Sequence, residues 1–230
     1  MRCVLVAIAV LASGCATTGG DPRDPLEGLN RGVYAFNQTV DDVVLSPVAR
    51  LYRAALPDGL QDTVRNAFNN IDDIAIGANN LLQGKVVDAL SDWLRFSINT
   101  TLGLLGAIDW ASDMGLEKHN EDFGQTLARW GVGDGPYLVL PLIGPATTRD
   151  AAGLPVDWYY DPVIEHRPIA QRNVLWGTRI VARRAELLDL TQAVDEGALD
   201  RYVFMRESWL QRRRNLVYDG RPPRERPPVD

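Results

Sequence analysis

The sequence is poor in the side chains that most often carry catalysis and metal binding. It has only two cysteines and two histidines. No Gly-x-Ser-x-Gly elbow, dinucleotide fingerprint or P-loop occurs, so the common signatures of acyl hydrolysis and nucleotide binding are missing. His119 lies near Glu121 and Asp122, but no second histidine or cysteine stands nearby to complete a metal site. We therefore expect no enzymatic activity, no metal and no cofactor.

Long hydrophobic runs are absent beyond the N-terminus. Two central segments, Leu102–Ala111 and Pro136–Pro145, are strongly apolar. Neither reaches the ~20 residues that a helix needs to cross a bilayer. The second contains three prolines, so it cannot be a regular helix interior. The first has no polar face, and a helix of that type is either fully enclosed or in contact with membrane.

Positive charge is in the minority. The chain has 30 acidic and 24 basic residues, a formal net charge of −6, which argues against a nucleic-acid partner. The exception is residues 201–230, which hold eight arginines and four acids. This basic stretch could face an acidic partner or anionic headgroups, or it could be an ordinary solvated helix face.

The N-terminus has the features of a bacterial lipoprotein signal. An apolar stretch follows Arg2, and Ala12-Ser-Gly-Cys15 resembles a lipobox, although Ala12 replaces the usual leucine. We expect residues 1–14 to be removed and Cys15 to carry acyl chains such as palmitate; the alternative is an ordinary secretory signal. No Asp follows Cys15, which favours the outer membrane. With Cys3 removed and Cys15 acylated, no thiol remains for a disulfide.

Apolar residues recur at helical spacing along most of the chain, and no strand alternation is sustained. The pattern predicts an all-α fold whose apolar stripes face inward. Asp24 is expected to cap the first helix, with Pro25 in its first turn and Glu27 completing a capping box. The expected helices cover residues 24–43, 46–56, 60–75, 86–98, 174–188 and 199–217.

The remaining segments read as connectors. We expect a flexible tether over residues 15–23, one helical domain over residues 24–218, and a disordered Pro- and Arg-rich tail over residues 219–230. Residues 147–150 and 153–162 are predicted to be loops or short turns.

Several motifs, in order along the chain, closely resemble the MlaA (VacJ) lipoprotein family. One departure is Ala35, where a bulkier or polar residue is expected. The motifs are Asp24-Pro-Leu-Glu-Gly-Leu-Asn-Arg-Gly-Val-Tyr-Ala-Phe-Asn37, Asn79-Asn-Leu-Leu-Gln-Gly-Lys85, Arg95-Phe-Ser-Ile-Asn-Thr-Thr-Leu-Gly103, Glu121-Asp-Phe-Gly-Gln-Thr-Leu127, Trp130-Gly-Val132, Gly135-Pro-Tyr-Leu138, Leu140-Pro-Leu-Ile-Gly-Pro145 and Arg149-Asp150.

This resemblance implies a lipid-anchored protein in the periplasmic leaflet of the outer membrane of a Gram-negative bacterium. It implies a ring-like helical domain with a central amphipathic channel. Through it, mislocalised phospholipids would leave the outer leaflet for a soluble periplasmic carrier, which maintains lipid asymmetry. The implied partners are phospholipid, the outer-membrane bilayer, a trimeric porin and the carrier. The family is not enzymatic.

The resemblance also assigns candidate residues. Phe36 and Asn37 match the segment on which gating of the family channel is thought to depend, so both are candidate lipid-path residues; the alternative is ordinary helix core and helix surface. The predicted membrane contacts, with burial inside the ring as their alternative, are Leu102, Leu104, Leu105, Ile108 and Trp110. The residues predicted to line or gate the channel, with Gly133 and Gly135 letting their loop move, are Tyr137, Leu138, Leu140, Leu142 and Ile143.

Two other functions compete with lipid transfer. A structural lipoprotein that only binds a porin would keep the anchor and the helices but would need no channel. A phospholipid hydrolase would need a nucleophile and a base, and the sequence offers neither in a recognisable arrangement.

Overall fold

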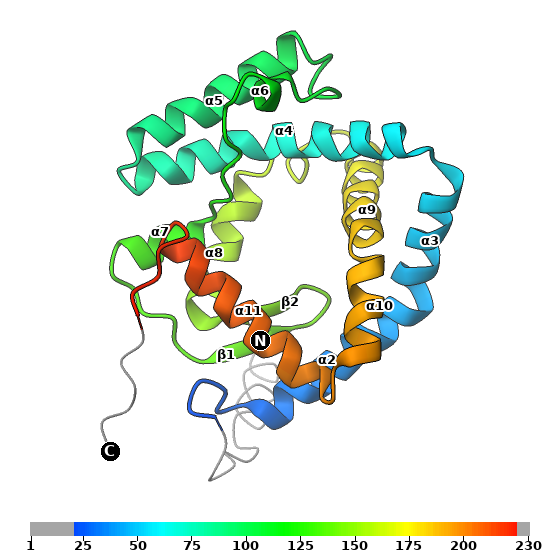
Figure 1. The fold of residues 1–230 in the computed structure, drawn as a ribbon, viewed down its shortest axis with the longest axis vertical. Coiled ribbons are helices and arrows are strands. Elements are labelled where there is room, and N and C mark those ends of the chain that lie inside the picture. The colour runs from blue at the N-terminus through cyan, green and yellow to red at the C-terminus, as the bar shows by residue number, and fades with distance from the viewer. Residues whose placement is uncertain (1–20, 225–230) are drawn as a thin grey trace.

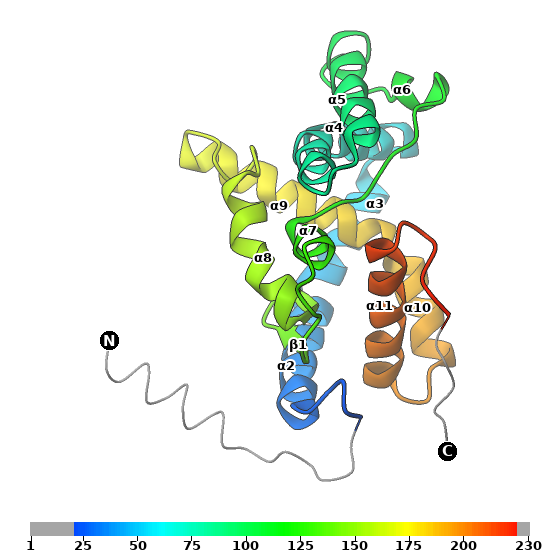
Figure 2. The ribbon, with the colours of Figure 1, turned by 90° about the vertical axis from the view of Figure 1, so that its left-hand side faces the viewer.

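The computed structural model describes residues 21–224, which are mostly helical (Figures 1 and 2). Cys15, the predicted signal peptide and most of the predicted tether lie outside this range, as do residues 225–230. The elements are α2 (Glu27–Val40), the π-helix η1 (Asp41–Leu45), α3 (Ser46–Ala55), α4 (Asp58–Leu82), α5 (Val86–Thr101), α6 (Trp110–Asp113), α7 (Phe123–Arg129), β1 (Tyr137–Leu140), β2 (Gly144–Thr147), α8 (Thr148–Tyr159), α9 (Ile169–Glu186), α10 (Leu188–Gly197) and α11 (Arg201–Val217).

The helices are arranged around a ring, which Figure 1 views face on. α4 forms one side, and α3 with α9 and α10 forms the next. α2 and the β-hairpin lie opposite α4, α7 and α8 complete the ring, and α11 runs across one face. α5 packs on the outside of α4. The prediction of an all-α, ring-like fold is confirmed, with one short hairpin added. Within residues 21–224 no helix is long and apolar enough to span a bilayer.

The interior of this ring wall is unusually polar. Among the described residues, eighteen buried side chains are polar or charged and thirteen are apolar. Of those thirteen, six are alanines. Buried polar groups need hydrogen-bond partners to be tolerated, so specific polar pairing contributes much of the contact between helices.

Much of the apolar stripe of α5 and part of that of α2 are exposed, so our prediction that these stripes face inward was wrong for most of α5 and holds only for half-buried members such as Val33 and Trp93. On α5 the buried side chains are Ala89, Asp92, Arg95 and Asn99, whereas Val87 is 79% exposed. On α2 only Asn30 is buried. Helical periodicity locates an apolar face, but it does not show whether that face packs against the protein core or contacts a membrane. The residues that stand outward on these two helices include Leu29, Phe36, Val86, Val87, Leu90 and Leu94.

The proline-broken segment folds into a hairpin, which the sequence did not predict. β1 and β2 pair antiparallel, with Tyr137 opposite Thr147 and Leu140 opposite Gly144. Leu142 and Gly144 turn the chain with φ values of 63° and 100°. A two-stranded hairpin has only edge strands, and edge strands tolerate proline. The prolines therefore exclude a regular helix in this segment but still allow the two strands to pair.

α8 replaces a segment predicted to be loops. Thr147 and Asp150 form a reciprocal capping box at its start, and Pro155 lies inside the helix. At Gly153 an added Cβ would approach the backbone of Gly124, so α8 packs closely on α7. The capping box and this packing outweigh the single backbone hydrogen bond that Pro155 removes. The short helices α6, α7 and α10 were also not predicted.

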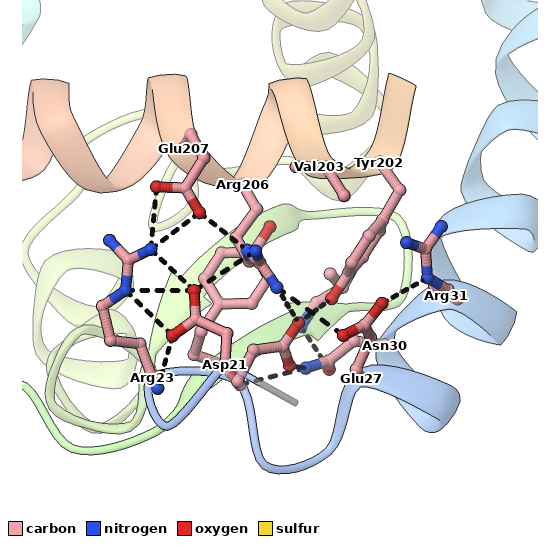
Figure 3. A network of polar contacts seen from close by, with 12 residues as sticks. Asp21, Arg23, Glu27, Asn30, Arg31, Tyr202, Val203, Arg206 and Glu207 are labelled. Carbon is pink, nitrogen blue, oxygen red and sulfur yellow. Dashed lines mark hydrogen bonds and ion pairs between the residues drawn. The ribbon is translucent and has the colours of Figure 1, made fainter. Parts of the chain in front are cut away.

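A network of ion pairs ties the N-terminal segment to α11 (Figure 3). Asp24 is 1% exposed. Its carboxylate accepts hydrogen bonds from Asn30 Nδ2 at 2.8 Å and from the Arg206 guanidinium at 3.1 Å. The Tyr202 hydroxyl donates to the same carboxylate. Burial, together with this carboxylate, raises the pKa of Tyr202.

Asp24 was predicted to cap α2, and this prediction was wrong. The residue at the N-cap is Leu26, whose side chain caps nothing. The carboxylate instead turns inward to the three donors of α2 and α11. Nearer the surface, Arg23 pairs with Asp21 and Glu207. The end of the predicted tether is therefore held to α11 by a surface ion pair as well as by the buried contacts of Asp24.

Removing the Asp24 carboxylate should destabilise the ring. Asp24→Ala leaves Arg206 as a buried cation with one partner fewer, and we expect a loss of about 3 kcal/mol in the free energy of unfolding. Urea denaturation followed by circular dichroism measures it. Asp42→Ala, at an exposed position in η1, serves as the control and should change stability by less than ~0.5 kcal/mol. Equal losses in the two variants would contradict this role.

Candidate functional site

The predicted site residues gather in two places. Those of the first apolar segment lie in the connection between α5 and α6. Those of α2 and of the second apolar segment meet where α2 packs on β1. The structure therefore joins Phe36 and Asn37 to the hairpin, and it keeps the loop of residues 102–110 apart from both (Figure 1).

The first apolar segment is a loop that displays its leucines. Leu104 and Leu105 are 72% and 78% exposed, and both adopt left-handed backbone conformations with φ of 52° and 61°. This region is unfavourable for leucine by roughly 1–2 kcal/mol. Leu102, Ile108 and Trp110 are exposed as well. All five predicted membrane contacts thus lie on the surface.

A set of buried polar groups holds this loop from beneath. Arg95, 2% exposed, donates to the two carboxylate oxygens of Asp109 at 3.1 and 3.0 Å. Asn99 donates to Asp109 at 2.8 Å and accepts from the Ala111 amide at 2.9 Å. The Gly106 amide donates to the Asn99 carbonyl at 2.8 Å. The exposed leucines are therefore fixed in place by the polar side of α5.

The expectation of an all-apolar helix over Leu102–Ala111 was wrong. α5 ends at Thr101, and only Trp110–Asp113 is helical again. Gly103 lies so close to the carbonyls of Asn99 and Ile108 that a Cβ there would collide with both. The glycines of this run thus mark a compact turn, which composition alone did not separate from a helix.

The exposed apolar surface extends beyond the predicted residues. It continues from the loop onto the outward side of α5, at Val87, Leu90 and Leu94. These positions were assigned to the core from their spacing. A signal for the correct assignment was present in the sequence, because Asp92, Arg95 and Asn99 recur at helical spacing on the opposite side of the same helix.

Two asparagines of α2 pair with the free edge of β1 and the hairpin turn. Asn37 Nδ2 donates to the Leu140 carbonyl at 2.9 Å, and its Oδ1 accepts from the Leu142 amide at 2.8 Å. Asn30 repeats the pattern, with Nδ2 to the Tyr137 carbonyl at 3.0 Å and Oδ1 from the Val139 amide at 2.9 Å. Each side-chain amide takes the place of a neighbouring strand.

The hairpin residues divide into exposed and buried ones. Leu142 and Ile143 at the turn are exposed, as is Phe36 on α2, and Leu138 and Leu140 are half-buried. An apolar groove of about 390 Å³ runs along α2 past Phe36 to Pro141. These residues form one apolar edge at the hairpin tip.

Tyr137 departs from its prediction as a channel-lining residue. It is 1% exposed, with its ring packed edge-on against Tyr202 at 6.4 Å and Trp209 at 6.0 Å. Alternation along β1 turns Tyr137 and Val139 toward α11 and the core. Its side chain is a core residue that holds the hairpin against α11.

Within residues 21–224 no group of three or more His, Cys, Asp or Glu side chains is placed to hold a metal ion. His119 contacts Asp92 at 2.8 Å through Nδ1. Glu121 instead accepts from Gln83 and Lys85, and Asp122 pairs with Arg213.

Comparison with known proteins places the chain in a family. The family model described as MlaA lipoprotein matches residues 22–216. The intermembrane phospholipid transport system lipoprotein MlaA of Escherichia coli (strain K12) is 34% identical over 238 residues, covering 99% of this chain and 94% of the relative. The protein of that name from Haemophilus influenzae is 32% identical, covering 96% and 92%.

A solved structure agrees with the sequence comparison. It is described as "Structural basis for maintenance of bacterial outer membrane lipid asymmetry" and matches with a TM-score of 0.73 and 33% identity, covering 84% of this chain and 98% of its own. Sequence and fold thus point the same way, and the chain belongs to the MlaA lipoprotein family.

Proposed function

We propose that this protein takes mislocalised phospholipids from the outer leaflet of the outer membrane through an amphipathic channel and passes them to a soluble periplasmic carrier, which maintains lipid asymmetry. The observation that carries this proposal is the inverted polarity of the ring wall. Apolar side chains are exposed on α2, α5 and the loop of residues 102–110, while many polar and charged ones are buried. Such a wall suits an apolar surrounding outside the ring.

The proposed location follows from the same surface. Cys15 would carry the acyl anchor, and Leu102, Leu104, Leu105, Ile108 and Trp110 would enter the periplasmic leaflet. Each fully buried leucine contributes roughly 1.5–3 kcal/mol when it leaves water, so a few of them add usefully to the lipid anchor. No catalytic step is proposed.

The hairpin turn is the proposed gate. Asn37 holds the turn through the Leu140 carbonyl and the Leu142 amide, and Phe36 lies beside it on α2. A displacement of α2 would therefore move the exposed residues Leu142 and Ile143 with it. Leu138 and Leu140 are the half-buried members of the same proposed path.

A second candidate is a porin-associated structural lipoprotein without transport. It is favoured by the exposed aromatic side chains at the end of α8, Trp158, Tyr159 and Tyr160. Clustered aromatic residues are enriched where proteins bind one another. A trimeric porin is the partner that the family resemblance implies.

Deletion of the gene separates the two candidates. Transport predicts more phosphatidylethanolamine on the cell surface of the deletion strain, measured by labelling intact cells with a membrane-impermeant amine reagent. The wild-type gene supplied in trans should restore the low level. Unchanged surface labelling, together with a loss of assembled porin trimers, would favour the structural candidate.

Asn37→Ala should loosen the hairpin turn without unfolding the ring. It removes two hydrogen bonds worth about 1 kcal/mol each, so we expect the Leu142 amide to exchange its hydrogen about tenfold faster or more. In the deletion strain the variant should leave more surface phospholipid than the wild-type gene does. Gln38→Ala, the next residue on α2, is the matched control. If the Leu142 amide exchanged at the wild-type rate in Asn37→Ala, Asn37 would not be what holds the hairpin turn.

Polar substitution of the displayed leucines should weaken membrane binding. In a Cys15→Ala background, which removes the acyl chains, Leu104→Asn/Leu105→Asn should reduce binding to phospholipid vesicles by about tenfold or more. Asparagine tolerates the left-handed backbone, so the turn is kept. Leu199→Asn, exposed at the distant connection between α10 and α11, should bind like its parent. Equal vesicle binding by all three proteins would argue against membrane contact by this loop.

A further inference from the structure

A polar pocket of about 310 Å³ lies where α4, α7, α8, α9 and α11 face one another. These elements surround the part of the ring beneath α4 (Figure 1). Five carboxylates and three arginines line the pocket, together with apolar side chains such as Ile71, Ile76 and Leu216. It therefore combines both signs of charge with an apolar wall.

Most of these charges already have partners. Arg179 pairs with Asp72 and, at 2.7 Å, with Asp161. Arg183 reaches the second oxygen of Asp72 at 2.8 Å. The remaining two paired carboxylates, Glu121 and Asp122, are bound by Lys85 and Arg213. These pairs neutralise one another and leave little net charge for a ligand.

Asp157 is the one lining carboxylate for which the described residues supply no ion pair. Its Oδ1 accepts the backbone amide of Phe123 at 2.9 Å. Burial, with the nearby negative charge of Asp122, raises the pKa of Asp157 to about 6. A carboxylate in this state gains free energy when a cation arrives beside it.

Arg212 is the matching cation. It lines the same pocket from α11, and within residues 21–224 its guanidinium makes no hydrogen bond or ion pair. A guanidinium binds phosphate oxygens well, since its planar donors match their spacing. One unpaired anion and one unpaired cation thus share one pocket.

We propose that this pocket receives the headgroup of a zwitterionic phospholipid, with the phosphate at Arg212 and the ammonium group at Asp157. The inference rests on the proposed function and adds to it a preferred class of lipid. A headgroup carrying a phosphate and an ammonium group satisfies both open charges at once. An anionic glycerol headgroup would engage Arg212 and leave Asp157 as a partly buried, unpaired carboxylate, which is unfavourable.

Calorimetric titration of the full-length protein with two short-chain lipids tests the proposal. Dihexanoyl phosphatidylethanolamine should bind about tenfold tighter than dihexanoyl phosphatidylglycerol. Asp157→Asn should weaken binding of the ethanolamine lipid until the two lipids bind within about twofold of each other. Arg212→Gln should weaken both, because both carry the phosphate. Asp113→Asn and Arg50→Gln, exposed and outside the pocket, should match the wild-type protein.

The Asp157 variant is expected to fold, because it removes a charge that burial disfavours; its melting temperature should equal or exceed that of the wild-type protein. An unchanged lipid preference in Asp157→Asn, or a wild-type preference for phosphatidylglycerol, overturns the proposal. Displacement of the lipid by equimolar soluble phosphoethanolamine overturns the lipid assignment in favour of a free metabolite. If Asp157→Asn keeps its preference while the deletion strain still accumulates surface phospholipid, the headgroup site fails and transport stands.

Discussion

Arg95 lies almost fully buried between two carboxylates, 3.6 Å from Asp73 and 3.0 Å from Asp109, and the outer part of the ring depends on this arrangement. It links α4, α5 and the loop that leads to α6. Removing one partner of such a buried pair costs roughly 3–5 kcal/mol, because an uncompensated charge remains. Polar pairs take much of the space between α4 and α5, and the larger aliphatic residues Val87, Leu90 and Leu94 lie exposed on the other side of α5.

α2 connects the ion-pair network around Asp24 with the hairpin turn, and one face of the helix makes the contacts to the hairpin. Asn30 and Asn37 stand seven residues apart, two turns of helix, so their side chains point the same way. Both make paired hydrogen bonds to the β1 edge and the hairpin turn. At its start, α2 is fastened to α11 by Asp24 and its donors. A rigid helix thus connects the ion network next to the predicted lipid tether with the turn that carries Leu142.

The sequence was enough to predict the helical fold class and to group the site residues by family motif. It was not enough to predict which side of a helix is buried, because here the buried side is often the polar one. The helical class followed from spacing, and the motifs brought Phe36 and Asn37 into one group with the hairpin. The orientation of α5 was wrong, because its rule assumes that apolar residues face a core, while the buried side of α5 holds Asp92, Arg95 and Asn99. The hairpin was missed because Pro136 and Pro141 were given more weight than strand pairing, and α8 was missed because its capping box and its close packing on α7 were not recognised in the sequence.

A phospholipid asks for two environments at once, and the fold supplies them on opposite sides of the same wall. The outer side holds leucines in a strained left-handed turn, a backbone cost that makes sense where their display is useful. The inner side holds arginines and aspartates whose partners are largely settled within the protein. Each pair of opposite charges is neutral as a group. A zwitterionic or neutral headgroup would therefore move past these pairs without binding tightly to them. In the proposed headgroup site, Asp157 and Arg212 would hold the headgroup, and two groups of opposite sign would fix it in one orientation.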